Sequence, residues 1–351
     1  MAAEGAEIAS GAVLLADFDY HLPHERIAQI AIEPRDAAKL LVDQGSAMPL
    51  HRHVSDLTEY LEPGDLLVVN DSKVIPARLK LNRASGGAAE VLLLEPIASI
   101  DGDRRVWEAL VRPGKKLKVG EQLHGRDGLP LVEIGERTAA GDTFQITLIG
   151  DGDPLALLDA NGDMPLPPYI TAPLGERDRY QTVYANEPGS AAAPTAGLHF
   201  TPELLASIRA MGVDIATVEL VVGLDTFQPM NVEDPLDHQI HSERYRVTAD
   251  VIERCHDARR VVAVGTTATR ALESAATFGE LEGRTRLFIH RGYEWKTVDV
   301  LMTNFHLPKT SLLVMIEAFI GPRWRRLYEE ALADDYRFLS FGDSMLLNRS
   351  L

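Results

Sequence analysis

The sequence predicts an α/β domain with a mixed, largely parallel sheet, and an inserted antiparallel β-barrel domain. The C-terminal 200 residues repeat a unit of buried strand, polar loop and helix, and such units build parallel sheets. The middle of the chain instead holds short β-rich runs between glycine turns, without a helical period. We therefore assign residues 1–72 and 152–351 to the α/β catalytic domain and residues 73–151 to the barrel.

Composition and length are those of a globular protein of about two domains. The chain has 351 residues, of which 45% are hydrophobic and 25% charged. One cysteine, Cys255, excludes a disulfide framework and a zinc site built on thiolates. No apolar run reaches the length of a membrane span, and the acidic segment MAAEGAEIAS is not a signal peptide. We expect a cytoplasmic protein without membrane contact, and a monomer.

The expected elements follow from local patterns along the chain. The barrel strands are expected at five short runs: Leu79–Leu81, Glu90–Leu94, Val106–Val111, Leu131–Ile134 and Phe144–Ile149. In the α/β domain, buried strands are expected at Ile215–Val222, Val261–Val264 and Val298–Met302, and helices at Arg270–Ala276 and Leu312–Phe319. Thr201 and Pro202 are typical of a helix start, and Gly212 of its end.

The charge is unevenly distributed. The chain carries a net charge of −17, which argues against a sequence-blind nucleic-acid binder. Residues 71–150 depart from this, with 12 basic and 11 acidic residues. Around the turn Pro113-Gly114 the basic side chains gather: Arg112, Lys115, Lys116 and Lys118. This turn is either a solvated hairpin tip or a surface that contacts an anion.

One polar loop follows a strand of the predicted sheet, at the point where ligands bind in open α/β folds. In the run VGTTATR (264–270), Gly265 permits a tight turn, and Thr266 and Thr267 lead into a helix. Helix N-termini attract carboxylates and phosphates. An ordinary helix cap would show a similar sequence, but three threonines and Arg270 in one loop favour an anion site.

Two further loops each place a histidine before a helix start. They are PTAGLHF (194–200), with His199, and TNFHLP (303–308), with His306. A lone loop histidine is more often a structural hydrogen-bonding group than a catalyst. The spacing of His238 and His241 would put two imidazoles on one face of a helix, as in a metal hydrolase. The H-E-x-x-H spacing of that class is absent, so we expect no metal.

Ten runs of the sequence resemble the QueA family of S-adenosylmethionine:tRNA ribosyltransferase-isomerases of queuosine biosynthesis. They occur in order from about residue 17 to residue 347: FDYHLPHERIAQ (18–29), PGDLLVVNDSKVIPARL (63–79), WEALVRPGKKLKVG (107–120), MPLPPYI (164–170), AAAPTAGLHFT (191–201), VGLDTFQP (222–229), HQIHSERY (238–245), VGTTATRALES (264–274), TNFHLPKTSLL (303–313) and YRFLSFGDSMLL (336–347).

The resemblance implies a reaction and its substrates. The ribosyl moiety of S-adenosylmethionine is transferred and isomerised onto 7-aminomethyl-7-deazaguanine at the wobble position of tRNAs with GUN anticodons. The product is epoxyqueuosine-tRNA, and adenine and methionine are released. The resemblance also implies an α/β domain with an inserted β-barrel.

Residue chemistry then suggests roles, because the reaction needs a base for the ribose carbon beside the sulfonium and a proton donor for adenine. Acid–base candidates are His199, His306, Asp225 and Glu243. The candidates for cofactor binding are Thr266, Thr267 and Arg270 for the methionine carboxylate, Asn304 for a ribose hydroxyl, and Thr195, Gly197 and Gly265 in the same loops. The basic turn at 112–118 is the candidate for tRNA.

The sequence departs from the family pattern in several places, among them Ile240 and Thr310-Ser311, and two departures fall in one loop. Val221 stands where the family has histidine, and Asp225 where it has a second glycine. These departures keep two alternatives open. One is a related S-adenosylmethionine-consuming transferase with another acceptor, and the other is an inactive tRNA-binding module.

Overall fold

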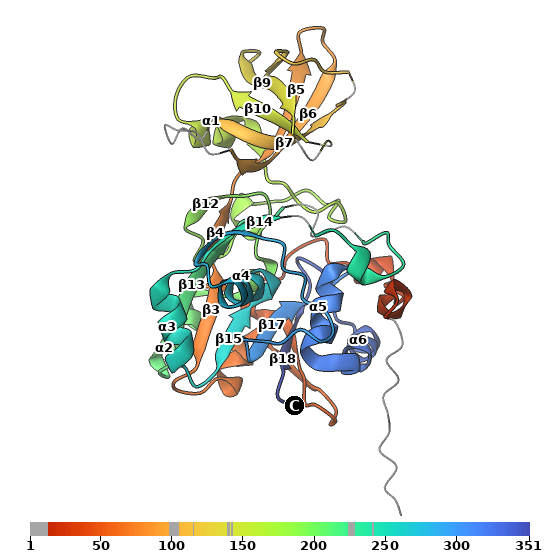
Figure 1. The fold of residues 1–351 in the computed structure, drawn as a ribbon, viewed down its shortest axis with the longest axis vertical. Helices are drawn as coiled ribbons and strands as arrows, with labels where there is room; N and C mark the ends of the chain where they lie inside the picture. Colours follow the sequence, from red (N-terminus) through yellow and green to blue (C-terminus); the bar gives the residue numbers. More distant parts are fainter. Residues whose placement is uncertain are drawn as a thin grey trace, which may run out of the picture.

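The computed structural model describes residues 13–97, 105–114, 116–138, 141, 143–223, 229–240 and 242–351. Three residues discussed above, Lys115, Asp225 and His241, lie outside these ranges. Figure 1 shows an α/β body that contains the C-terminus, with a separate barrel joined to one end of it.

The body is built on one large mixed sheet, as predicted. In spatial order its strands are β16 (Glu282–Thr285), β14 (Glu243–Arg246), β13 (Asp214–Leu220), β3 (Leu66–Asn70), β15 (Val261–Val264), β17 (Val300–Asn304), β18 (Ser344–Asn348), β1 (Lys39–Val42) and β2 (Leu50–His53). The central strands β13, β3, β15 and β17 are parallel to one another. Antiparallel pairings add β14, β16, β18 and β2 toward the edges.

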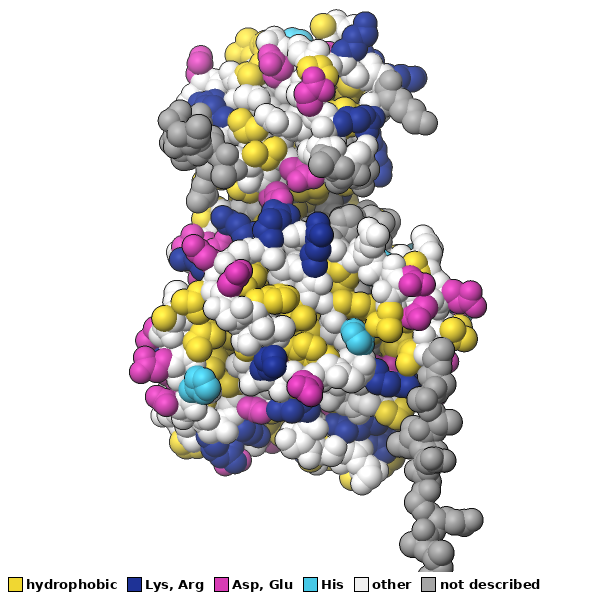
Figure 2. Space-filling view, viewed as in Figure 1, with side chains coloured by type: hydrophobic (Ala, Val, Ile, Leu, Met, Phe, Trp, Pro, Cys, Tyr) yellow, Lys and Arg dark blue, Asp and Glu magenta, His cyan; other side chains and the backbone are white. Residues whose placement is uncertain are grey.

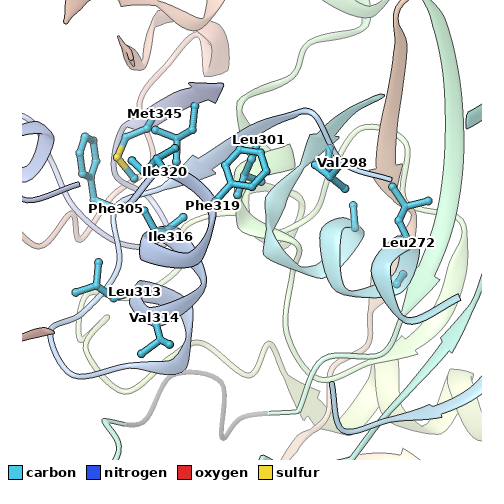
Figure 3. Close-up of a cluster of buried hydrophobic side chains, with 14 of the residues drawn as sticks. Leu272, Val298, Leu301, Phe305, Leu313, Val314, Ile316, Phe319, Ile320 and Met345 are labelled. Carbon is cyan, nitrogen blue, oxygen red and sulfur yellow. The ribbon is translucent and has the colours of Figure 1, made fainter. Parts of the chain in front are cut away.

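The strands β3, β15 and β17 are buried along their whole length because the sheet is covered on both faces. Along β15, Ala263 packs into one hydrophobic cluster, and Val262 and Val264 pack into the other. The body helices are α2 (Pro202–Ala210), α3 (Ala249–Asp257), α4 (Gly265–Phe278), α5 (Ser311–Ile320) and α6 (Trp324–Ala333). Figure 3 shows how side chains of α4 and α5, among them Leu272, Ile316 and Phe319, meet Leu301 of β17.

The structure starts α2 where the sequence predicted it: the Thr201 side chain accepts a hydrogen bond from the backbone nitrogen of Leu204 (3.1 Å). One predicted boundary was wrong. The helix expected at Arg270–Ala276 begins at Gly265, so the threonines form its first turn instead of a loop before it. Gly265 adopts a φ of +87°, which lets the chain turn from strand into helix without an intervening loop.

The barrel is a closed antiparallel sheet of six strands, and it confirms the predicted fold class. Its strands are β5 (Arg78–Arg83), β6 (Ala88–Pro96), β7 (Val106–Arg112), β8 (Gln122–His124), β9 (Pro130–Arg137) and β10 (Phe144–Leu148), and the pairing of β5 with β8 closes it. Five of these strands overlap the expected runs. The sixth, β8, was not expected because three residues are too few to show an alternating pattern.

The chain continues on the barrel after its last strand. The short helix α1 (Pro154–Asn161) buries Leu158 in the barrel core, and β11 (Gly162–Asp163) pairs with β5. At the junction, β4 (Ser72–Val74) pairs in parallel with β12 (Glu187–Ser190). The domain boundaries at residues 73 and 151 stay predictions. Among the described helices, none is long and apolar enough to cross a membrane.

Candidate active site

A narrow pocket of about 50 Å³ lies at the carboxyl ends of the central parallel strands. The segments after β13, β15 and β17 all contribute to its wall, as the topology of open α/β sheets leads one to expect. The predicted site residues that line it are Thr195, Gly265, Thr266, Thr267, Asn304 and His306. Residues more than 100 positions apart in the sequence therefore meet at one edge of the sheet.

A hydrogen-bonded chain joins the two histidine loops. Thr195 Oγ1 donates to Asn304 Oδ1 (3.0 Å), and Asn304 Nδ2 donates to His199 Nε2 (3.3 Å). Since an amide nitrogen can only donate, Nε2 of His199 is the acceptor and Nδ1 carries the proton of the neutral ring. His199 is buried and does not line the pocket. Its contact with the pocket is therefore made through Asn304.

His306 borders the pocket directly. Its Nε2 lies 3.0 Å from Thr303 Oγ1, and its backbone nitrogen donates to Tyr328 Oη (3.0 Å). Burial lowers the pKa of His306, and likewise of His199, to about 3. Both rings are therefore neutral at pH 7. Each can accept a proton, but the protonated ring is not stable at that pH unless a negatively charged group lies beside it.

The first turn of α4 presents polar groups to the same pocket. Thr269 Oγ1 donates back to the carbonyl of Gly265 (3.1 Å), so this hydroxyl is used within the helix. Thr267 Oγ1 is buried and has no hydrogen-bond partner among the described residues. A buried hydroxyl without a partner is costly, which favours a ligand oxygen at this position.

Gly197 has a packing role. A Cβ at this position would fall 1.9 Å from Tyr184 Oη, so only glycine lets the loop pass the tyrosine. Gly197 does not line the narrow pocket. Its predicted part in cofactor binding is therefore at most indirect.

A second, larger cavity lies beside the first, and we call it the interdomain cleft. It has a volume of about 850 Å³ and is bounded by barrel residues on one side and by the β14–β16 edge and α5 on the other. Leu312 lines both cavities. Arg270 and Glu243 belong to this cleft and form a buried ion pair, in which Arg270 Nη1 donates to Glu243 Oε2.

The Arg270 guanidinium is only partly satisfied by Glu243. The side chain is 9% exposed, and its Nε and Nη2 atoms have no hydrogen-bond partner within the described part of the chain. Glu243 Oε1 accepts from the backbone nitrogen of Gly223 (3.3 Å). The carboxylate thus holds the guanidinium in place while two of its nitrogens remain available to an anion.

Comparison with known proteins decides the family. The model of a queuosine biosynthesis protein family matches residues 15–347. The chain belongs to the queuosine biosynthesis protein family. This confirms the resemblance seen in the ten sequence runs.

Several members of the queuosine biosynthesis family are similar over nearly their whole length. A protein of Symbiobacterium thermophilum named S-adenosylmethionine:tRNA ribosyltransferase-isomerase is 50% identical over 95% of this chain and 99% of its own. One of the same name from Moorella thermoacetica is 48% identical, with the same shares covered. The crystal structure of S-adenosylmethionine tRNA ribosyltransferase from Thermotoga maritima covers 94% of this chain and 99% of its own at 36% identity, with a TM-score of 0.53.

Sequence reasoning missed several side chains of this family member's two cavities. Tyr169 and Ser340 line the narrow pocket and are joined by a hydrogen bond of 2.8 Å, and burial raises the pKa of Tyr169. Both lie in runs that carried the resemblance, MPLPPYI and YRFLSFGDSMLL, which was the available signal. Phe288 and Glu108 line the cleft; Glu108 lies in the run WEALVRPGKKLKVG, whereas Phe288 lies in none of the ten runs.

Other predicted groups lie apart from both cavities. Arg112, Lys116 and Lys118 are exposed at the barrel turn and line neither cavity. Lys115 and Asp225 are outside the described ranges. Val221, which replaces a histidine of the family pattern, is buried at the wall of the cleft.

The possible metal site lacks the geometry that its spacing suggested. His238 follows a short 3-10 helix (Pro235–Asp237) and is not on an α-helix, and His241 lies outside the described ranges. Within those ranges, no group of three or more His, Cys, Asp or Glu side chains is placed to hold an ion. The expectation that no metal takes part stays a prediction.

Proposed function

We propose that this chain transfers and isomerises the ribosyl moiety of S-adenosylmethionine onto 7-aminomethyl-7-deazaguanine at the tRNA wobble position. The product is epoxyqueuosine-tRNA, with release of adenine and methionine. The observation that carries the proposal is the convergence of three polar loops at one pocket in a chain 50% identical, nearly end to end, to a relative with this enzyme name.

In this proposal S-adenosylmethionine binds across the first turn of α4. Thr266 and Arg270 are four residues apart and so share one face of the helix. The helix N-terminus, the free hydroxyl of Thr267 and the available nitrogens of Arg270 together suit the methionine carboxylate. Asn304, held between Thr195 and His199, suits a ribose hydroxyl.

The proton transfers are assigned to groups that reach the pocket. His306 is the candidate base for the ribose carbon beside the sulfonium, because its ring is neutral at pH 7 and it lines the pocket. His199 orients Asn304. Glu243 orients Arg270, and Asp225 stays a candidate for protonation of adenine.

The substrate tRNA carries a GUN anticodon in this proposal, and the enzyme acts as a cytoplasmic monomer without a metal. The exposed basic turn, with Arg112, Lys116 and Lys118 described and Lys115 beside them, is proposed to contact the phosphate backbone away from the reaction.

One experiment tests the function. The protein is incubated with S-adenosylmethionine and tRNA that carries the 7-aminomethyl-7-deazaguanine precursor, and adenine release is measured. We expect release only when this tRNA is present. Release with the free base alone would identify a transferase with another acceptor, and tRNA binding without any release would identify a binding module.

A further inference from the structure

The interdomain cleft has the size and walls of a nucleotide site. Its volume of about 850 Å³ lies within the roughly 300–1,000 Å³ of small-molecule sites, whereas the narrow pocket has about 50 Å³. Arg284 of β16 donates to Glu95 of β6 (2.6 Å), so an ion pair links the body to the barrel across the cleft. The cleft is thus an ordered feature of both parts of the fold.

Basic side chains stand at the rim of the cleft. Arg284 is half exposed, and Arg286, two residues further on, is exposed and makes no ion pair with any described residue. Figure 2 shows Lys and Arg side chains gathered on the body where it meets the barrel. In a chain with a net charge of −17, a local basic rim of this kind suits a phosphate backbone.

Inside the cleft is an aromatic and apolar surface. The Phe288 ring packs edge-on against His238 (ring centroids 6.4 Å apart) and lies 5.7 Å from the ring of His290. Leu312 and Met315 of α5 line the same cavity. An aromatic ring beside basic residues is the usual combination for stacking an unpaired base.

The barrel wall adds a hydrogen-bond acceptor. Glu108 of β7 accepts from Thr143 Oγ1 (2.5 Å) and from Thr138 Oγ1 (3.4 Å), both through Oε1. The other oxygen, Oε2, makes no hydrogen bond with the described residues. A carboxylate held in this way can accept from the ring N–H and amino group on the edge of a guanine-like base.

The cleft also lies where an acceptor must be. Leu312 lines both the cleft and the narrow pocket, and Thr266 and Arg270, one helical turn apart, line the pocket and the cleft respectively. A base in the cleft would therefore lie beside a ribose held in the pocket.

We propose that the interdomain cleft is the acceptor subsite, which takes one RNA nucleotide unstacked from its neighbours. The base stacks on Phe288 and is read by Glu108, and the flanking phosphates lie against Arg284 and Arg286. This proposal rests on the proposed function. It assigns the reacting nucleotide to the cleft and leaves the exposed barrel turn to more distant parts of the tRNA.

The stacking contact is tested with Phe288→Ala and an anticodon stem-loop RNA that carries the precursor base. We expect the RNA dissociation constant to rise roughly fivefold to a hundredfold, the effect of losing one base–aromatic stack. S-adenosylmethionine affinity, measured by calorimetry, should be unchanged. Phe278→Ala is the matched control, because Phe278 is 52% exposed at the end of α4 and lines neither cavity.

The phosphate contact is tested with Arg286→Gln against Arg209→Gln, an exposed arginine on α2. Only the cleft variant should weaken RNA binding, and the slope of log affinity against log salt should become shallower by about one unit. Circular dichroism and thermal melting confirm that each variant is folded.

The outcomes separate the two proposals. If the unaltered protein neither binds the RNA nor releases adenine, the proposed function is wrong. If it does both, and Phe288→Ala and Arg286→Gln bind RNA like their controls, the function stands and the acceptor subsite is overturned.

Discussion

The narrow pocket and the interdomain cleft are neighbours with opposite properties. The pocket is lined by neutral side chains that include the buried, uncharged His306, and the buried, uncharged His199 lies behind its wall. The cleft is open and charged, and its ion pairs include one that spans two parts of the fold. The narrow pocket has room for only a small part of a ligand, whereas an open charged cleft suits a polymer that must enter and leave.

The largest effect is expected from a substitution in the narrow pocket. His306→Ala should lower turnover by about a hundredfold or more, the usual size of the effect when an acid–base group is removed. S-adenosylmethionine binding should change little, because the first turn of α4 is untouched. Single-turnover adenine release measures the effect, and His256→Ala, an exposed histidine on α3, is the control. Equal turnover in both variants would remove His306 from the chemistry.

The burial of the two histidines predicts a loss of stability in acid. Their pKa values in the folded protein lie near 3, below the value of about 6.5 in an unfolded chain, so the unfolded state binds more protons in between. Stability should therefore fall as the pH drops from about 6.5 toward 3, by up to about 1.4 kcal/mol per pH unit for each histidine.

Urea unfolding at pH 7.5 and pH 5 measures this loss. His199→Gln and His306→Gln should each show a shallower pH dependence than the unaltered protein, and His256→Gln should not. If neither variant changes the pH dependence of the free energy of unfolding, the two rings are already protonated or solvated in the folded protein.

Arg270→Ala tests whether this residue, which lines the cleft, also binds the methionine carboxylate of S-adenosylmethionine. Removal of its hydrogen bonds to the methionine carboxylate should weaken S-adenosylmethionine binding by about 1–3 kcal/mol. Thr266→Val tests the same subsite without breaking the ion pair of Arg270 with Glu243. Calorimetry measures both. If both variants bind the cofactor with unchanged affinity, the carboxylate lies elsewhere and Arg270 belongs to the acceptor side alone.

The smallest effect is expected outside both cavities. Lys116→Glu combined with Lys118→Glu should raise the tRNA KM and lower the salt slope by about one unit for each phosphate that is no longer neutralised by a lysine. S-adenosylmethionine affinity should be unchanged. Arg209→Glu on α2 controls for the change in net charge. If the double variant and its control have the same tRNA affinity at low salt, the basic turn is a solvated hairpin tip.

The sequence located the strands and helices that carry the site residues better than it located the side chains that those residues contact. The strands β13, β15 and β17 were predicted within two residues because runs rich in β-branched and other apolar residues mark them. The polar segments that follow β15 and β17 meet at the narrow pocket. The start of α4 was missed, because a glycine at positive φ replaced the loop that the threonines suggested.

The sequence could not show which side chains contact the site residues. His199 was expected to be catalytic, and the structure places it behind Asn304, a contact between residues 105 positions apart that the sequence could not show. Arg270 was placed with the threonines but reaches the neighbouring cleft and pairs with Glu243, a strand residue 27 positions earlier. Nothing in the sequence around Phe288 distinguishes it from an ordinary core or surface residue, and the run that contains Glu108 does not show that this side chain faces the cleft.

The sequence by itself determined most of the strands and helices, the barrel inserted in an α/β domain, and the family. These depend on hydrophobic periodicity, turn residues and long family-like runs, all of which are visible in the sequence alone. Only the tertiary structure decided which groups share a cavity and which remain unsatisfied. The unpartnered hydroxyl of Thr267, the half-satisfied Arg270 and the pairing of Arg284 with Glu95 all depend on contacts between distant segments. Such contacts set burial, and burial sets the pKa values and the free hydrogen-bonding groups from which the chemistry follows.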